Sequence, residues 1–107
     1  MHREIRKSLV YLTPKSFLRL RTATSIAKEF APGISFNEVL NDDTVKDVSK
    51  ISHVLICAGK IFYNLNQHRQ KHNREDLAII RCEQLCPFPT HQLHHIIYRY
   101  PQSGQII

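Results

Sequence analysis

The sequence predicts an α/β domain built on a mostly parallel sheet with flanking helices, and three observations support this fold class. Apolar runs typical of buried strands begin near residues 53, 77 and 104, at intervals of about 25 residues. A stretch with helical periodicity lies between each pair of these runs. Strands and helices that alternate in this way form right-handed βαβ units on a parallel sheet.

Residues 51–107 carry this regular pattern. The run HVLICAGK has the composition of a buried strand that ends at Gly59, and residues 61–65 then repeat apolar side chains at helical spacing. A very polar stretch follows, and LAIIRCEQL, which begins at Leu77, is the next strand. This part of the chain is therefore expected to form a βαβαβ arrangement.

The last predicted helix has the clearest periodicity. Four apolar residues fall on one helical face, namely Leu93, Ile96, Ile97 and Tyr100. Thr90 is placed to cap the N-terminus of this helix, and Pro101 is placed to end it. GQII then resembles the opening of another strand. A parallel strand with no helix after it leaves one sheet face poorly covered, so we expect the domain to be truncated after Ile107.

Residues 1–50 are less regular and are expected to belong to the same domain as residues 51–107. SLVYLT, which begins at Ser8, is rich in β-forming residues and is interpreted as the first strand. An irregular helical segment is expected over residues 17–30, followed by a second extended segment, ISFNEVLND. The polar residues 41–50 are interpreted as a surface connection.

Composition narrows the function classes without choosing among them. The chain has 15 Lys and Arg against 9 Asp and Glu, and its net charge of +6 favours anionic partners. No apolar run approaches the roughly 20 residues that span a bilayer, so no membrane partner is expected. Three cysteines without a framework spacing fit a reducing compartment better than secretion.

One group of residues has a spacing that suggests zinc: Cys82, Cys86, His91, His94 and His95. Zinc ligands must converge on one tetrahedral point, whereas Cys82 lies inside a predicted strand and His94 lies on a helix whose apolar face is elsewhere. Free cysteine is usually buried as a small hydrophobic residue. We therefore expect no metal site, and the sequence contains no recognisable catalytic constellation either.

Two basic features have a functional interpretation and a simpler structural one. Gly59 and Lys60 lie at a predicted strand-to-helix turn, where backbone N–H groups favour an anion, but the sequence favours an ordinary tight turn with a solvated lysine. The basic residues from His68 to Arg74 lie near the end of a predicted helix, where the dipole favours cations. Binding of nucleic acid would require interleaved aromatic residues, and Tyr63 is the only candidate nearby. We therefore expect a solvated face and no nucleic-acid partner.

Arg81 and Glu83 share strand parity, so their side chains point to the same side of the predicted sheet. An inward-facing arginine must be paired, because an isolated buried charge is costly. Two interpretations are open: an ion pair with Glu83 or another carboxylate at the strand end, or a contact with a neighbouring domain or an effector.

Three collinear stretches show a resemblance to a known family. RKSLVYLTPKSFLR, VLICAGKIFYNL and LAIIRCEQLCPFP resemble, in order and spacing, segments near the C-terminus of the first component of 2-oxoglutarate dehydrogenase, the thiamine-diphosphate-dependent decarboxylase. The resemblance extends from Arg6 to Tyr100. Ser8 and Ala58 depart from the family pattern, where proline and serine are usual. LCPFP is also similar to the 2-oxoadipate dehydrogenase branch.

This resemblance implies a transketolase-like C-terminal domain, normally fused behind two thiamine-binding domains in a homodimer. The parent protein would decarboxylate 2-oxoglutarate or 2-oxoadipate and transfer the acyl group to a lipoyl acyltransferase component. Its location would be the mitochondrial matrix in a eukaryote and the cytoplasm in a bacterium. The family's motif for thiamine diphosphate and magnesium has no counterpart here, so we expect this chain to hold no cofactor and to be inactive alone.

The resemblance further implies that this region supports the dimer and, in some members, helps to bind a CoA-type effector. Seven residues are the candidates for the effector or interface surface: Arg6, Lys7, Lys15, Ser16, Lys60, Arg81 and Glu83. A hypothesis of a different class is a stand-alone basic module that binds an anionic ligand or nucleic acid through Lys60 and the helix ending near Arg74.

Overall fold

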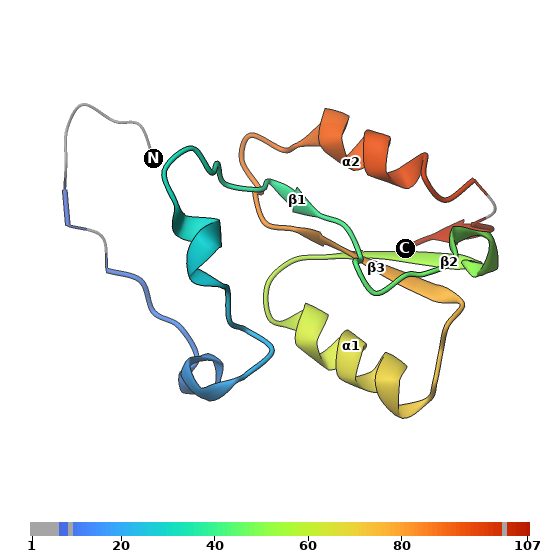
Figure 1. Cartoon of the computed structure of the whole chain (residues 1–107), viewed down its shortest axis with the longest axis horizontal. Coiled ribbons are helices and arrows are strands. Elements are labelled where there is room, and N and C mark those ends of the chain that lie inside the picture. The colour runs from blue at the N-terminus through green and yellow to red at the C-terminus, as the bar shows by residue number, and fades with distance from the viewer. Residues whose placement is uncertain (1–6, 9, 102) are drawn as a thin grey trace. The chain divides into compact units, whose positions relative to one another are not determined.

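The structure is a computed structural model that describes residues 7, 8, 10–101 and 103–107. The chain divides into two compact units, Met1–Ile34 and Ser35–Ile107, and Figure 1 labels the helices and strands. Whether residues 1–50 form one domain with residues 51–107 stays a prediction.

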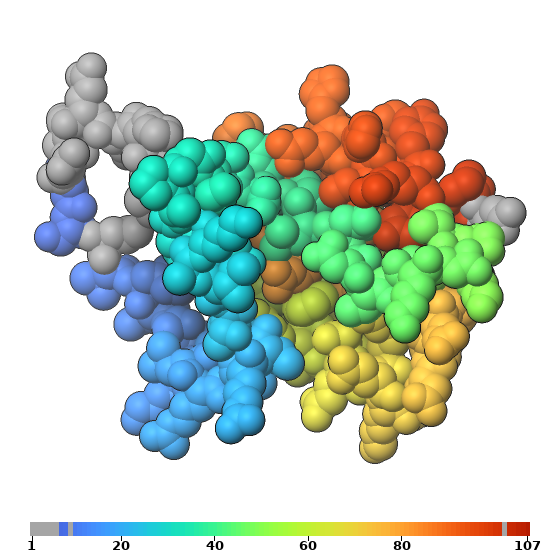
Figure 2. Space-filling model, in the orientation of Figure 1, coloured from blue at the N-terminus to red at the C-terminus, as the bar shows by residue number. Residues whose placement is uncertain are grey.

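The first unit contains two short 3-10 helices, η1 (Lys15–Arg19) and η2 (Ala27–Phe30). None of its described residues is buried, and they are the atoms coloured from blue to cyan in Figure 2. The strand predicted to begin at Ser8 is wrong, because the described residues of SLVYLT form no strand; Leu9 lies outside them. A strand needs a backbone partner for its N–H and C=O groups, and β-forming composition alone does not supply one.

The second unit is built on a four-stranded sheet with the strand order β1-β3-β2-β4. The strands are β1 (Val39–Leu40), β2 (His53–Cys57), β3 (Leu77–Cys82) and β4 (Gln105–Ile106). β2 pairs in parallel with both β3 and β4, and β1 pairs antiparallel with β3. The predicted α/β fold with a mostly parallel sheet is therefore confirmed, together with the strand starts near 53, 77 and 104.

Two α-helices connect the parallel strands and lie on opposite faces of the sheet (Figure 1). α1 (Ile61–Lys71) joins β2 to β3, and α2 (Thr90–Ile97) joins β3 to β4. The first connection leads from β2 to its neighbour β3, and the second returns past β2 to β4. Right-handed crossovers in opposite directions place their helices on opposite faces.

The predicted ends of α2 are only partly correct. The cap position is taken by Pro89, and Thr90 is the first helical residue, so the predicted Thr90 cap is wrong. The helix ends at Ile97, and Tyr100 then lies in a turn in which its N–H bonds the carbonyl of Ile97 at 2.9 Å. Tyr100 nevertheless belongs to the core, as its periodicity predicts.

The main core lies between the sheet and α2. Val54, Ala78 and Ile80 are fully buried and pack in one cluster with Leu93 and Tyr100. Since neighbouring strand residues point to opposite faces, Ile79 and Arg81 face the other side of the sheet, toward α1. The core thus holds β3 rigidly, and β3 in turn positions the side chains of the α1 face.

Candidate functional site

The carboxyl edge of the parallel sheet brings together the ends of β2 and β3, and in open α/β sheets ligands bind outside this edge. After β2 the chain turns at Gly59, whose φ of +65° is a left-handed conformation that glycine adopts without strain. Lys60 is the N-cap of α1 and makes no side-chain capping hydrogen bond. The predicted strand-to-helix turn is confirmed, and the first N–H groups of α1 have no side-chain cap.

Arg81 lies near the carboxyl end of β3, in register with Cys57 of β2. Its guanidinium carbon is 4.5 Å from the centre of the Phe62 ring, a cation–π geometry. Its Nε atom is 3.4 Å from Oε1 of Glu83, and the two side chains are 25% and 32% exposed. Of the two open interpretations, the ion pair with Glu83 is present, and the contact with a neighbouring domain or an effector stays a prediction. Both side chains are partly exposed to solvent.

Cys57 lies in the same register row and is half-buried. Burial raises the pKa of the Cys57 thiol; the nearby Arg81 lowers it by a smaller amount, and Glu83 adds to the rise. The thiolate is the nucleophilic form of cysteine, so this shift keeps Cys57 in its unreactive thiol form at neutral pH.

The seven candidate residues fall into different parts of the chain. Lys60, Arg81 and Glu83 lie at the carboxyl edge of the sheet. Lys7, Lys15 and Ser16 belong to the first unit, where all three are exposed. Arg6 lies outside the described residues. The structure therefore groups three of the seven at one edge.

The buried charges of the second unit were not predicted. Asp42 and Arg69 are each 8% exposed and form an ion pair. Arg69 also donates to the carbonyl of Leu77 at 3.3 Å, to Oγ1 of Thr44 at 2.8 Å and to Oδ1 of Asn66 at 2.8 Å. The prediction of a surface connection is wrong for Asp42, and the prediction of a solvated basic face is wrong for Arg69.

The Asp42 carboxylate accepts a backbone hydrogen bond from β3 beyond the end of β1. β1 ends at Leu40, and beyond it Asp42 accepts the backbone N–H of Ile79 at 2.9 Å. It also accepts the Thr44 N–H at 3.1 Å and the Thr44 hydroxyl at 2.6 Å. Burial by itself raises the pKa of Asp42, but the hydrogen bonds from Thr44, Ile79 and Arg69 outweigh it, so the pKa is lowered. Asp42 is therefore ionised at neutral pH.

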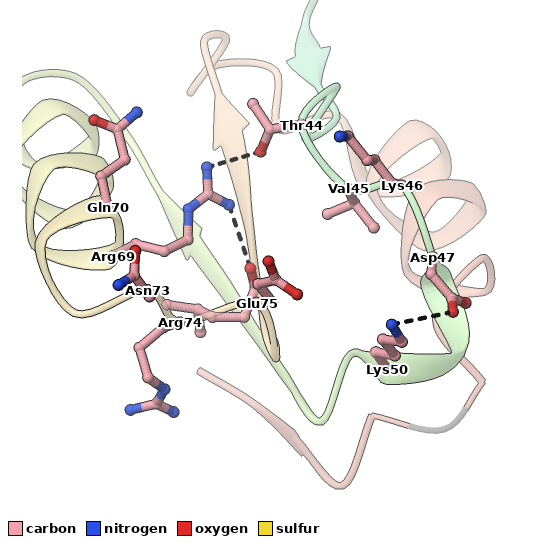
Figure 3. A pocket seen from close by; sticks show the side chains of 11 residues that line it. Thr44, Val45, Lys46, Asp47, Lys50, Arg69, Gln70, Asn73, Arg74 and Glu75 are labelled. Atoms are coloured by element: carbon pink, nitrogen blue, oxygen red, sulfur yellow. Dashed lines mark hydrogen bonds and ion pairs between the residues drawn. The ribbon is translucent and has the colours of Figure 1, made fainter.

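A polar pocket of about 360 Å³ lies beside Arg69 (Figure 3). Leu77, the first residue of β3, lines it, so the pocket lies at the opposite edge of the sheet from Arg81. Its walls are the segment from Thr44 to Lys50, the C-terminal end of α1 and the turn before β3. Several of its charges are neutralised by neighbours, since Lys50 pairs with Asp47 at 4.0 Å and Arg69 with Asp42. None of the seven candidate residues lines this pocket, although Arg69 and Arg74 of the predicted basic face do. We place the candidate site at the carboxyl edge, where such folds bind ligands.

The described residues show neither a metal cluster nor a membrane-spanning helix. Within residues 7, 8, 10–101 and 103–107, no three His, Cys, Asp or Glu side chains are grouped so that they could hold a metal ion. Cys82 is buried and its thiol donates to the carbonyl of Gln84 at 3.1 Å, whereas Cys86 is exposed. In the same part of the chain, no helix has the length and apolar character needed to cross a membrane.

Comparison with known proteins gives consistent results. A family model described as 2-oxoglutarate dehydrogenase C-terminal matches residues 24–107. The chain is 44% identical over 104 residues to a probable 2-oxoadipate dehydrogenase complex component E1 homolog of Dictyostelium discoideum. The matched region covers 96% of this chain and 12% of that protein. It is 42% identical to the human 2-oxoadipate dehydrogenase complex component E1, covering 94% of this chain and 11% of that protein.

A bacterial relative matches equally broadly. The 2-oxoglutarate dehydrogenase E1 component of Azotobacter vinelandii is 40% identical over 105 residues, which cover 98% of this chain and 11% of that protein. The chain thus spans about a tenth of the length of these relatives. Because the family model covers most of the sequence, the chain belongs to the 2-oxoglutarate dehydrogenase C-terminal family.

Proposed function

We propose that this chain serves as the C-terminal domain of a longer E1 component that decarboxylates 2-oxoglutarate or 2-oxoadipate and passes the acyl group to a lipoyl acyltransferase. The family match over residues 24–107 carries this proposal, supported by relatives named as E1 components of both kinds. We place the parent in the mitochondrial matrix if its source is eukaryotic and in the cytoplasm if its source is bacterial.

Thiamine diphosphate with Mg²⁺ would supply the carbanion chemistry in such a parent. The family's motif for thiamine diphosphate and magnesium has no counterpart in this sequence. We therefore assign the cofactor to other parts of the parent chain. The role proposed for the present domain is to support the homodimer and to bind a CoA-type effector.

The carboxyl edge of the sheet is the proposed effector surface. Arg81 stacks on Phe62, and its ion pair with Glu83, at 3.4 Å, is longer than a hydrogen bond. The guanidinium thus has donors available for the phosphate oxygens of a CoA-type ligand. Lys60 lies at the N-terminus of α1, where backbone N–H groups and the helix dipole attract anions. In the first unit, Arg6, Lys7, Lys15 and Ser16 are separately proposed as contacts of an effector or of the dimer mate.

The alternative, a stand-alone module that binds anions through the basic end of α1, has less support. Arg69 is buried and paired with Asp42. Arg74 donates two hydrogen bonds to Asp76, at 2.7 and 2.8 Å. Charges that are already neutralised contribute little to the attraction of an anionic partner.

Replacing Arg81 with alanine is expected to weaken acetyl-CoA binding about 10- to 100-fold, the effect of losing one or more hydrogen bonds to a charged group. Binding is measured by titration calorimetry on the folded chain. Arg99→Ala is the control, because Arg99 is an exposed arginine that follows α2 at the other end of the sheet. Failure of the wild type to bind acetyl-CoA, or equal losses in both variants, would contradict the effector surface.

A chimeric enzyme tests the parent assignment. In the Azotobacter vinelandii E1 component, the segment that matches this chain is replaced by the present sequence. We expect a dimer that decarboxylates 2-oxoglutarate, because the grafted domain has the same fold and the host supplies the cofactor site. Host protein lacking the segment is the control and is expected to lose both properties. A chimera that is soluble yet monomeric and inactive would overturn the proposed role.

A further inference from the structure

The polar pocket beside Arg69 has two walls that are held together by buried contacts. One wall is the segment 44–50, which follows β1, and the other is the C-terminal end of α1 with the turn before β3 (Figure 3). Arg69 joins the walls, because it extends from α1, donates to Oγ1 of Thr44 at 2.8 Å and pairs with the buried Asp42. The pocket is therefore formed before a ligand enters, and its volume of about 360 Å³ suits a small molecule.

The wall of residues 44–50 carries a net positive charge. Asp47 accepts hydrogen bonds from the N–H and the hydroxyl of Ser49, at 3.0 and 2.6 Å, and its carboxylate lies 4.0 Å from Nζ of Lys50. Asp47 thus offsets the charge of Lys50. Lys46 also lines the pocket, is exposed and has no ion-pair partner within the described part of the chain. One uncompensated ammonium group therefore remains on this side of the pocket.

The opposite wall carries a net negative charge. Its two arginines are neutralised, since Arg69 pairs with Asp42 and Arg74 donates two hydrogen bonds to Asp76. Glu75 lines the pocket, is exposed and forms no ion pair with any described residue. The C-terminal end of α1 lies on the same side, and its last carbonyl groups form the negative end of the helix dipole. This wall therefore favours a cationic group.

We propose that this pocket binds a small zwitterion of the α-amino acid class, with its carboxylate at Lys46 and its ammonium group at Glu75. A ligand with both charges complements both walls, whereas a simple anion is repelled by Glu75 and a simple amine by Lys46. The side-chain amides of Gln70 and Asn73 also line the pocket and offer donors and acceptors to a polar side chain such as that of glutamine. The proposal does not depend on the role assigned to the parent enzyme.

The test is a titration of the ¹⁵N-labelled chain with L-glutamine, followed through the backbone amide resonances of residues 44–50 and 70–77. We expect these resonances to shift in a saturable way. Binding is expected to be about 10- to 100-fold weaker for glutaminamide, which lacks the carboxylate, and for N-acetylglutamine, which lacks the ammonium group, because each loses a hydrogen bond to a charged group. Inorganic phosphate, an anion without an ammonium group, is expected to shift none of these resonances at the same concentration.

Two variants assign the contacts. Lys46→Met is expected to weaken glutamine binding about 10- to 100-fold and to leave the binding of glutaminamide unchanged, because that ligand has no carboxylate to lose. Glu75→Gln is expected to weaken glutamine binding by a similar factor and to leave the binding of N-acetylglutamine unchanged. Both side chains are exposed, and unchanged resonances elsewhere in the spectrum show that the fold is retained.

Lys71→Met and Glu29→Gln are the matched controls, and both are expected to leave glutamine binding unchanged. Lys71 is an exposed lysine at the end of α1, Glu29 is an exposed glutamate of the first unit, and neither lines the pocket. Three results would each overturn the proposal: no saturable shift with glutamine, equal affinity for glutamine and its two single-charge analogues, or binding of phosphate that Lys46→Met alone abolishes. The last result would identify an anion site.

Discussion

Replacing Arg69 with methionine is expected to lower the free energy of unfolding by about 3–5 kcal/mol, the cost of leaving one member of a buried ion pair without its partner. Methionine retains much of the apolar volume of the arginine stem, so packing changes little. The Asp42 carboxylate would keep its bonds to Thr44 and Ile79 but lose its counter-charge. Urea denaturation followed by far-ultraviolet circular dichroism measures the loss.

Arg74→Met is the matched control for this variant. Arg74 follows the same helix and pairs with Asp76, but these side chains are 51% and 37% exposed. Exposed ion pairs contribute about 0–1 kcal/mol, because water and salt screen the charges. If the two variants are destabilised equally, the Asp42–Arg69 pair is as solvated as the Arg74–Asp76 pair, and its structural role is refuted.

The importance of Arg69 could not be predicted from the sequence, and the reason is physical. Its partner Asp42 is 27 residues away and lies in a polar stretch with no helical or strand periodicity. Local periodicity reports which side of an element faces the core, but it carries no information on which distant side chains meet. β1 is only two residues long, so a side chain takes over the bond that a longer edge strand would make to Ile79.

The elements from residue 51 onward were predictable because their apolar residues repeat with the period of the element they form. The strand predicted at SLVYLT had suitable composition, yet its described residues form no strand, since β-propensity expresses fit to a neighbouring strand. The periodicity of apolar residues thus predicted the helices and buried strands well. An extended segment becomes a strand only where a neighbouring strand pairs with it, and its own composition does not show whether one does.

The features of the candidate site that lie within one element were predictable from the sequence, and the contacts between elements were not. Strand parity was sufficient to place Arg81 and Glu83 on the same side of the sheet, with their ion pair as one of two interpretations. One glycine was sufficient to place the turn before Lys60. The stacking of Arg81 on Phe62 was missed, because it depends on how α1 packs over β3 and not on spacing within either element. The register of β2 and β3, which sets Cys57 beside Arg81, likewise emerges only from the assembled sheet.

Replacing Ile80 with alanine is the second large perturbation, with an expected loss of about 2–5 kcal/mol in the free energy of unfolding. Ile80 is fully buried in the cluster that α2 covers, beside Ile56 of β2. Alanine would remove apolar contacts and leave a cavity that the surrounding strands can close only in part. Urea denaturation of the two proteins measures the difference.

Ile61→Ala is the control of equal chemistry, because Ile61 is 50% exposed at the start of α1. Alanine is also the better helix former, so this variant is expected to change stability by about 0.5 kcal/mol or less. Equal costs would mean that α2 does not bury β3 in solution. In that case Arg81, the residue after Ile80, would have no rigid strand beneath it, and the proposed effector surface at the carboxyl edge would lose its structural basis.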